Sequence, residues 1–288
     1  MTRGQKAFAR PTGTIYADLH LHSNQSDGTD PPTQVVARAA AVGLHAMALT
    51  DHDTTAGSEE AAEAAAGEGI RFIPGVEVSS EFDGIEIHIL GLGLSHESDE
   101  LEAKLVEVRD DRTTRVHLMI QKLSDLGIQI SPDDIGAEIG NTTSPGRLHV
   151  ARALYRIGVT KSIQDAFTRY IGIGRPAYVP KKRMAASEAI DLIHGAGGIA
   201  SIAHPALGGV FKKLPKLLAL PFDAVEVWHP EHRAGQSEAF ATLVRENGLI
   251  ATGGSDDHGS RTERKNIGRT GLNEEGFKAL LQSLDRTT

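Results

Sequence analysis

The 288-residue sequence contains no cysteine and no long apolar run. The absence of cysteine excludes disulfide bonds, thiolate metal sites and cysteine nucleophiles, and it fits a cytoplasmic location. No segment approaches the roughly 20 consecutive apolar residues that a membrane-spanning helix needs, so we expect no contact with a membrane. The first fourteen residues carry three basic groups but lack the apolar stretch of a signal peptide.

An excess of basic residues is also missing. With 30 basic and 38 acidic residues the formal net charge is −8, which argues against a protein that coats polyanions. The basic residues are concentrated at positions 141–183, where nine Lys and Arg accompany a single acid, Asp165. This local excess favours an anion-binding site. The alternative is that Lys181, Lys182 and Arg183 form an ordinary solvated loop.

Short β-branched or apolar runs alternate with helical patterns, an order typical of a parallel sheet or barrel. We expect strands at residues 14–19, 46–50, 71–74, 85–92, 199–203, 224–227 and 250–252. We expect helices at residues 31–41, capped by Asp30, and at 58–66, 186–194, 234–247 and 274–284. The sequence therefore predicts an α/β fold, and its length suits a single barrel.

The alternation is interrupted in the middle of the chain. A long amphipathic helix at residues 100–126 is followed by a stretch with Gly, Ser and Pro and then by shorter helices. We interpret residues 98–180 as a helical insertion. The two halves of the barrel are then residues 14–97 and 181–288.

Histidines and carboxylates occur at or just beyond the ends of the expected strands. The set consists of His20, His22, His52, Glu77, His88, His204, Asp256 and His258. In a (β/α) barrel the carboxyl ends of the strands open on one face, where such enzymes place their chemistry. Any one of these histidines alone is more often a core or surface residue, but the set favours a metal site. Imidazole and carboxylate without thiolate suit zinc, manganese or iron.

These motifs carry a family resemblance. The segments DLHLHSNQSDG, ALTDHD, GVEVSS, IHILGL, AHP and GGSDDH resemble the successive motifs of the polymerase and histidinol phosphatase (PHP) family of metallophosphoesterases. The resemblance runs from Asp18 to about Gly259, with the motifs in the family order. It implies a distorted (β/α)7 TIM-like barrel that holds two to three divalent ions, Mn²⁺, Fe²⁺ or Zn²⁺.

The resemblance also implies which residues hold each ion. The first ion would take His20, His22, Glu77 and Asp256. The second would share Glu77 as a bridge and add His88 and His204. The third would take Asp27, His52 and His258. Some members of the family have histidine at the position of Asp27.

The insertion resembles that of a narrower group. SPGRLHVARAL and AFTRYIGIGRPAYVP are similar to the insertion of stand-alone bacterial members, described as nucleoside 3′,5′-bisphosphate phosphatases and as 5′→3′ exoribonucleases on short RNA. This chain has Leu148 where the usual Gly-Arg-Pro-His motif has proline. We expect Arg147, His149 and Arg175 to hold a second phosphate. We interpret Arg152 and Arg156 as a solvated helix face.

The expected reaction is hydrolysis of a phosphate ester by a metal-bound hydroxide, without a side-chain nucleophile. Asp53 or His229 would protonate the leaving group. His229 and His232 lie in EVWHPEH, which resembles the EVYHPxH stretch of the narrower group, and a purely structural role for both remains open. Asp18 and Asp51 would orient metal-binding histidines through their second ring nitrogen.

The expected substrate is a phosphorylated nucleotide or a short oligonucleotide, with no obligate protein partner. The 3′-phosphate of a nucleoside 3′,5′-bisphosphate and the 5′ end of a short RNA are the leading possibilities. Three alternatives remain: a phosphatase for a small metabolite such as histidinol phosphate, a metal-dependent amidohydrolase, and a non-catalytic module that binds nucleotides or nucleic acid. No lysine ends a strand near the cluster, as the carboxylated lysine of amidohydrolases would require.

Overall fold

The computed structural model describes residues 11–95, 98–139, 142, 145–180, 184–262 and 265–287. Three of the basic residues of interest, Lys181, Lys182 and Arg183, lie outside these ranges, as does the boundary expected between residues 180 and 181. No helix within the described ranges is long and apolar enough to cross a membrane.

One curved sheet forms the centre of the molecule. Its strands, in spatial order, are β1 (Ala17–Asp18), β2 (Ala46–Leu49), β3 (Arg71–Phe82), β4 (Ile85–Leu92), β6 (Ile199–Ile202), β7 (Ala224–Trp228) and β8 (Ile250–Gly253), and β5 (Met184–Ala185) pairs with β3. Segments beyond β1 and β8 join the two edges, because the amide of Leu19 donates to Gly253 O at 3.2 Å and that of His22 to Asp257 O at 3.0 Å. The expected distorted seven-stranded α/β barrel is confirmed.

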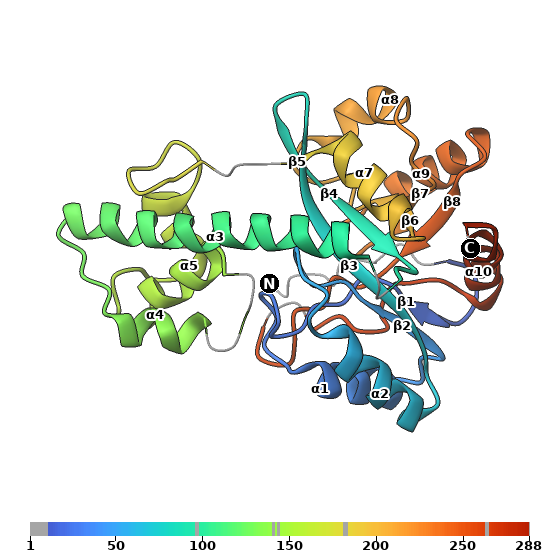
Figure 1. The fold of residues 1–288 in the computed structure, drawn as a ribbon, viewed down its shortest axis with the longest axis horizontal. Helices are drawn as coiled ribbons and strands as arrows, with labels where there is room; N and C mark the ends of the chain where they lie inside the picture. The colour runs from blue at the N-terminus through green and yellow to red at the C-terminus, as the bar shows by residue number, and fades with distance from the viewer. Residues whose placement is uncertain are drawn as a thin grey trace, which may run out of the picture.

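Helices cover the outside of this barrel (Figure 1). They are α1 (Pro32–Ala41), α2 (Ser58–Glu68), α7 (Ala186–Gly195), α8 (Leu214–Leu217), α9 (Ala234–Glu246) and α10 (Glu274–Thr287), with a 3₁₀ turn at Val210–Lys213. Each turns an apolar stripe toward the sheet. For example, Phe277 and Leu280 of α10 pack in one core cluster with Ala17 of β1 and Ala224 of β7.

The antiparallel β3–β4 hairpin is the main departure from a regular barrel. β3 extends to Phe82 rather than ending at the expected residue 74, and Asp83 and Gly84, both at positive φ (49° and 79°), turn the chain directly into β4. Consequently, β4 runs antiparallel to both of its neighbours. Glu77 is therefore inside a strand and does not follow one. His88 reaches the same mouth from the first half of a strand that runs the opposite way.

Two expected helix ends are shifted for local reasons. α1 begins after Pro31, which is its N-cap residue, because the Asp30 carboxylate pairs with Arg38 instead. α2 continues through Gly67 and ends at Gly69, whose left-handed φ of 69° suits glycine. The other expected elements lie within a few residues of the observed ones. The short β5 was missed.

The segment that we interpret as an insertion is largely helical in the part that the structure describes. It contains α3 (Asp99–Asp125), α4 (Pro132–Ile139), α5 (Arg147–Arg156), α6 (Ile163–Ala166) and a π-helical turn at Phe167–Ile171. The long α3 runs from the barrel into the insertion (Figure 1). Its first part packs Leu101 and Leu105 on the barrel core, and its second part packs Met119 and Leu123 on a separate core with α5. One helix thus joins the two regions.

Candidate metal centre

Glu77 lies at the centre of a cluster of buried histidines and carboxylates. Its Oε2 atom lies 3.2 Å from Nε2 of His20 and 3.2 Å from Nε2 of His22. Its Oε1 atom lies 2.8 Å from Nδ1 of His88 and 3.0 Å from Nε2 of His204. Oε2 also lies 3.2 Å from Nδ1 of His52, so the two oxygens of one carboxylate together face five imidazoles. This is the geometry that a bridging ligand between two ions requires.

A second group adjoins the first. His22, Asp27, His52 and His258 each offer a ligand atom within 4.8 Å of the others. Asp27 Oδ1 lies 3.3 Å from Nε2 of His258, and Asp27 Oδ2 lies 4.0 Å from Nε2 of His52. Asp256 reaches the first group, with Oδ1 3.2 Å from Nε2 of His22. The structure thus brings together the residues that we expect as metal ligands.

The donor atoms fit divalent ions. Metal–ligand bonds of about 2.0–2.1 Å place neighbouring ligands roughly 3.0–3.4 Å apart, which matches most of the spacings around Glu77. Several atoms of the cluster are also buried without a hydrogen-bond partner: His22 Nδ1, Asp27 Oδ1, His52 Nδ1 and His204 Nδ1. Buried polar atoms are rarely left unsatisfied, so these atoms indicate that the cluster holds cations.

The electrostatics of the cluster lead to the same conclusion. Burial alone would raise the pKa of Glu77, but the neighbouring His52, His88 and His20 hold that pKa well below its usual range. Burial would lower the pKa of His22, but its hydrogen bonds and charge interactions with Asp256 and Glu77 raise the pKa to about 10. Without ions, the carboxylates thus favour protons on His20 and His22, whereas burial lowers the pKa of His52 to about 3. A bound divalent ion would displace such protons.

Buried partners orient two of the imidazoles. Nδ1 of His20 lies 3.0 Å from Oε1 of Glu226, and Nδ1 of His258 lies 2.9 Å from the carbonyl oxygen of Asp256. Each Nδ1 therefore carries the proton and donates it, which leaves Nε2 free to bind a metal. The other oxygen of Glu226 accepts from the backbone N–H of His204 at 2.6 Å.

Glu226 is a functional residue that sequence reasoning missed. It is fully buried on β7. Burial would raise its pKa, but His20, His229 and His204 hold it at about 2. We looked for ligands beyond the strand ends, whereas this carboxylate lies inside the strand segment AVEVW. A charged residue inside an otherwise apolar buried strand was the available signal.

The predicted contacts of Asp18 and Asp51 with histidine rings are wrong. Asp18 accepts from the backbone N–H groups of Ser255 at 2.9 Å and Gly268 at 3.0 Å, and burial raises its pKa to about 7. Asp51 accepts from Ser23 N and Oγ at 2.8 and 2.6 Å and from Ser26 Oγ at 2.5 Å. Both carboxylates therefore fix the backbone of loops that carry ligands. Among the described residues they do not make the expected contacts with the rings of the metal-binding histidines.

The two expected proton donors differ in their surroundings. Both oxygens of Asp53 are engaged, Oδ1 by the N–H of Ser79 at 2.7 Å and Oδ2 by Arg112 Nε at 2.7 Å. Nε2 of His229 instead faces the cluster, 3.4 Å from Asp256 Oδ2. Since Glu231 N–H donates to Nδ1 of His229 at 3.1 Å, a neutral His229 ring carries its proton on Nε2. The geometry favours His229 as the donor to a leaving group.

Of the three residues expected to hold a second phosphate, two lie in the first turn of α5. Arg147 NH2 lies 3.7 Å from Oε2 of Glu86. His149 is buried, and burial followed by the charges of Arg152 and Arg112 lowers its pKa to about 4, against the opposing effect of Asp27. Arg175 is exposed after the π-helical turn. Its side chain makes no hydrogen bond or ion pair with the cluster in the described part of the chain.

The expected solvated face of α5 is correct for one arginine and wrong for the other. Arg156 is 43% exposed and pairs with Asp134 and Glu138 inside the insertion. Arg152 instead turns toward the barrel, where its NH2 donates to the carbonyl of Asp27 at 3.1 Å. Arg152 and Arg156 lie four residues apart on one helix, but the barrel lies beside Arg152 and not beside Arg156, so their environments differ.

Backbone strain is concentrated at the cluster. Asp53, His204 and Asp256 have φ of 53°, 28° and 49°, in the left-handed region that residues other than glycine rarely adopt. Gly254 allows a close approach, since a Cβ there would lie 2.3 Å from Cβ of His20. Strained backbone of this kind is typical of functional sites.

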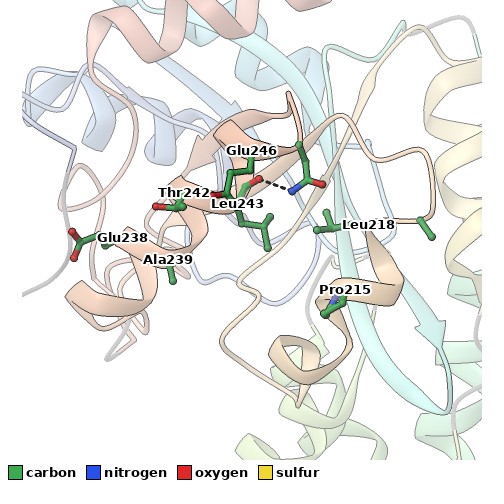
Figure 2. A pocket seen from close by; sticks show the side chains of 9 residues that line it. Pro215, Leu218, Glu238, Ala239, Thr242, Leu243 and Glu246 are labelled. Atoms are coloured by element: carbon green, nitrogen blue, oxygen red, sulfur yellow. Dashed lines mark hydrogen bonds between the residues drawn. The ribbon is translucent and has the colours of Figure 1, made fainter.

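A surface groove between α8 and α9 is separate from the cluster (Figure 2). Its lining includes Pro215 and Leu218 on one side and Glu238, Thr242 and Glu246 on the other. It contains no histidine and none of the expected ligands. The groove therefore has no part in the metal site.

Comparisons with known proteins agree with this geometry. A family model described as the PHP domain matches residues 18–173. The chain is 38% identical over 258 residues to the 3′,5′-nucleoside bisphosphate phosphatase of Chromobacterium violaceum, covering 88% of this chain and 90% of that protein. It is 37% identical to a 5′-3′ exoribonuclease of Haemophilus influenzae, covering 84% and 89%.

A solved structure is also similar. A protein from Bifidobacterium adolescentis, assigned to the metal-dependent phosphoesterases, superposes with a TM-score of 0.85 and 30% identity, covering 95% of this chain and 97% of that one. The similarity therefore includes the insertion as well as the barrel.

Proposed function

Because the chain belongs to the PHP domain family, we propose that it hydrolyses the 3′-phosphate of nucleoside 3′,5′-bisphosphates and removes nucleotides from the 5′ end of short 5′-phosphorylated RNA. It is a hydrolase of phosphoric esters that depends on divalent metal. The proposal includes three bound ions, with the ligands around Asp256, Glu77 and Asp27 that the family resemblance implies. It also includes the identity of these ions as Mn²⁺, Fe²⁺ or Zn²⁺, and a cytoplasmic location of the protein.

The observation that carries the proposal is the position of the cationic turn of α5 beside the cluster. Arg147 lies 3.7 Å from Glu86, and Glu86 lies 3.8 Å from Nε2 of His88. A cation one carboxylate away from a metal ligand is well placed to hold a second phosphate of the same small substrate. Residues 98–180 would then form a substrate cap.

His149 supports the same function through its ring nitrogens. The N–H of Gly146 donates to Nδ1 of His149 at 3.0 Å, and burial keeps the ring neutral near pH 7, since its pKa is about 4. The ring proton is therefore on Nε2, which can donate a hydrogen bond to a phosphate oxygen. Arg147 would supply the positive charge for the second phosphate, and His149 would supply a hydrogen bond that orients it.

One chemical step accounts for both activities. In a bisphosphate, water attacks the 3′-phosphorus and the bond to O3′ breaks, which releases phosphate and leaves a nucleoside 5′-phosphate. In RNA, attack at the first internal phosphorus breaks the same P–O3′ bond and releases the terminal nucleoside 5′-phosphate. The departing O3′ accepts a hydrogen bond from His229 Nε2–H, and the proton that it takes up is the one released by the attacking water. Bound divalent ions would supply an activated water and neutralise the phosphoryl oxygens.

The overall charge limits the length of the substrate. Affinity for long strands grows with the number of phosphates that cations neutralise, and this chain carries a net charge of −8. We therefore propose nucleotides and short oligonucleotides as substrates, without an obligate protein partner.

The test is turnover of adenosine 3′,5′-bisphosphate and of a 5′-phosphorylated RNA oligomer by Mn²⁺-loaded protein, with the products resolved by mass. The proposal expects adenosine 5′-phosphate from the first and nucleoside 5′-phosphates from the second. Release of adenosine 3′-phosphate would contradict it. Turnover of histidinol phosphate alone would instead support the small-metabolite alternative.

A further inference from the structure

The insertion touches the barrel beside the metal-binding residues. α3 and α5 send arginine side chains to two turns of the barrel, one around Asp53 and one around Asp27. Each turn carries a residue of the group that would hold the third ion, namely His52 and Asp27. Because these contacts reach turns that carry metal-binding residues, they can position those residues as well as join the two regions.

Arg112 forms the tighter contact. Its Nε and NH2 atoms lie 2.7 and 2.5 Å from Oδ2 of Asp53, and NH2 also lies 2.8 Å from Oγ of Ser79. Asp53 is fully buried and the Arg112 side chain is 11% exposed. A planar guanidinium that bridges two partners holds them in a fixed geometry, which a flexible ammonium does not. Arg109 adds a hydrogen bond to the carbonyl of Asp53 at 3.2 Å.

The Asp53 turn fixes His52. Asp53 follows His52 directly, and its φ of 53° is strained. Its N–H donates to the carbonyl of Glu77 at 3.0 Å, so the turn also joins the backbone that carries the bridging carboxylate. A strained turn persists only where its surroundings hold it. Arg112 is the charged part of those surroundings.

Arg152 holds the second turn. Its NH2 donates to the carbonyl of Asp27 at 3.1 Å, and its side chain is half-buried. The Asp27 carboxylate lies between the rings of His258 and His52. A hydrogen bond to the main chain of Asp27 therefore helps to fix the position of the Asp27 carboxylate directly.

The first ion's site is anchored differently. Glu226 on β7 orients His20, and Glu226 also holds the backbone of His204 from the second ion's site. Both contacts lie within the barrel. The insertion's link to the second site is looser, since Arg147 approaches Glu86 at 3.7 Å, and Glu86 in turn lies 3.8 Å from His88.

We propose that Arg112 and Arg152 are positioning residues for the third metal ion, so that the insertion braces this site more directly than the other two. The inference rests on the three-ion centre of the proposed function. It makes the occupancy of the third site depend on contacts made from outside the barrel. Docking of the insertion and binding of the third ion then stabilise each other.

The test is stepwise binding of Mn²⁺ to metal-free protein. Calorimetry and metal analysis after equilibrium dialysis measure the affinity of each step. Asp27→Asn identifies the step that belongs to the third site. Arg112→Met and Arg152→Met should weaken that step by about 10- to 100-fold, the range typical when the outer contacts of a metal ligand are removed. The other two steps should weaken much less, because Arg112 reaches Glu77 only through Ser79 and the Asp53 turn. Arg112→Lys should recover part of the loss.

Arg156→Met is the matched control. It lies on the same helix as Arg152, one turn away, and among the described residues it forms its ion pairs within the insertion. Its three binding steps should equal those of the wild type. If Arg112→Met fails to fold, Arg112→Lys and Arg152→Met still carry the test.

The outcomes separate the two proposals. Wild-type protein that binds three ions, with variants that bind all three equally well, would overturn the positioning role and leave the proposed function intact. Equal weakening of all three steps would also overturn it, since that is the result of general loosening. Wild-type protein that binds no Mn²⁺ would refute the metal centre itself.

Discussion

The mouth of the barrel and the basic face of the insertion meet at one site but are built in different ways. At the mouth, the ligand side chains come from several strands and are mostly buried, and partners such as Glu226 fix their rings. On the insertion, the cationic groups come from two helices, and the side chain of Arg147 is 27% exposed. The first arrangement tolerates little change in geometry. The second can vary while the first remains intact.

This difference indicates a division of labour. The barrel supplies the reaction, since the groups that can hold metal ions are barrel residues. In our proposals the insertion supplies selectivity for a second phosphate and a brace for one ion. Changes of the metal ligands at the mouth should therefore abolish turnover of every substrate, whereas loss of a phosphate-binding cation on the insertion should distinguish between substrates.

The largest effect is expected at Glu77. Glu77→Gln removes the charge that faces five imidazoles, and a catalytic metal contributes several kcal/mol to the transition state, so kcat/KM should fall on the order of 10³-fold. The loss should be equal for a bisphosphate and for a simple monoester. Steady-state kinetics with both substrates measure it. A loss confined to the bisphosphate would break the division between the two regions.

Glu226 should come next. Glu226→Gln places an amide N–H₂ against either the Nδ1–H of His20 or the N–H of His204, because both sides of Glu226 accept hydrogen bonds. Affinity for the first two ions should fall by about 10- to 100-fold. Mn²⁺ titration of metal-free protein checks this. Unchanged affinity would show that β7 does not brace the site.

Arg147 sharpens the comparison from the other side. Arg147→Ala should raise KM for adenosine 3′,5′-bisphosphate by roughly 10-fold or more, since hydrogen bonds to charged groups contribute about 1.5–3 kcal/mol. KM for a monoester without a second phosphate should stay within about twofold, because such a substrate offers Arg147 no phosphate to bind. Equal effects on the two substrates would refute the second-phosphate role.

The last prediction concerns the pH dependence of stability, through one buried histidine in each region. Burial, followed by the charge of His229, lowers the pKa of His232 in the barrel from 6.5 to about 4, and His149 in the insertion has a similar pKa. The unfolded chain then binds the extra proton first, so the stabilising contribution is complete above pH 6.5 and is lost as the pH falls toward 4.

His232→Asn and His149→Asn should each reduce the fall in the free energy of unfolding between pH 7 and pH 4, by at most about 3 kcal/mol. Denaturant unfolding of chelator-treated protein at several pH values measures this. Parallel pH profiles for a variant and the wild type would contradict the buried neutral state of that histidine.

Much of the barrel site could be predicted from the sequence because strands impose order. A period of two places His20 and His22 on one face, and parallel strands bring their carboxyl ends to one mouth. His88 was placed correctly although β4 runs antiparallel. The hairpin that reverses β4 also places the first half of that strand at the mouth.

Contacts between regions could not be predicted in this way. Asp53 was expected to donate a proton because it follows His52, but its partner Arg112 lies on a helix of the insertion, and no local pattern links the two. Arg152 and Arg156 look alike in sequence and differ only in what lies beside them. Glu226 was overlooked because it lies within a strand.

The central claim is that a metal centre at the barrel mouth performs the hydrolysis. The most direct measurement follows Mn²⁺ binding and release of phosphate from adenosine 3′,5′-bisphosphate in the same titration of metal-free protein. The account predicts no turnover without metal, activity that rises with occupancy, and three Mn²⁺ ions per chain at saturation. Phosphate release that is independent of bound metal would contradict it.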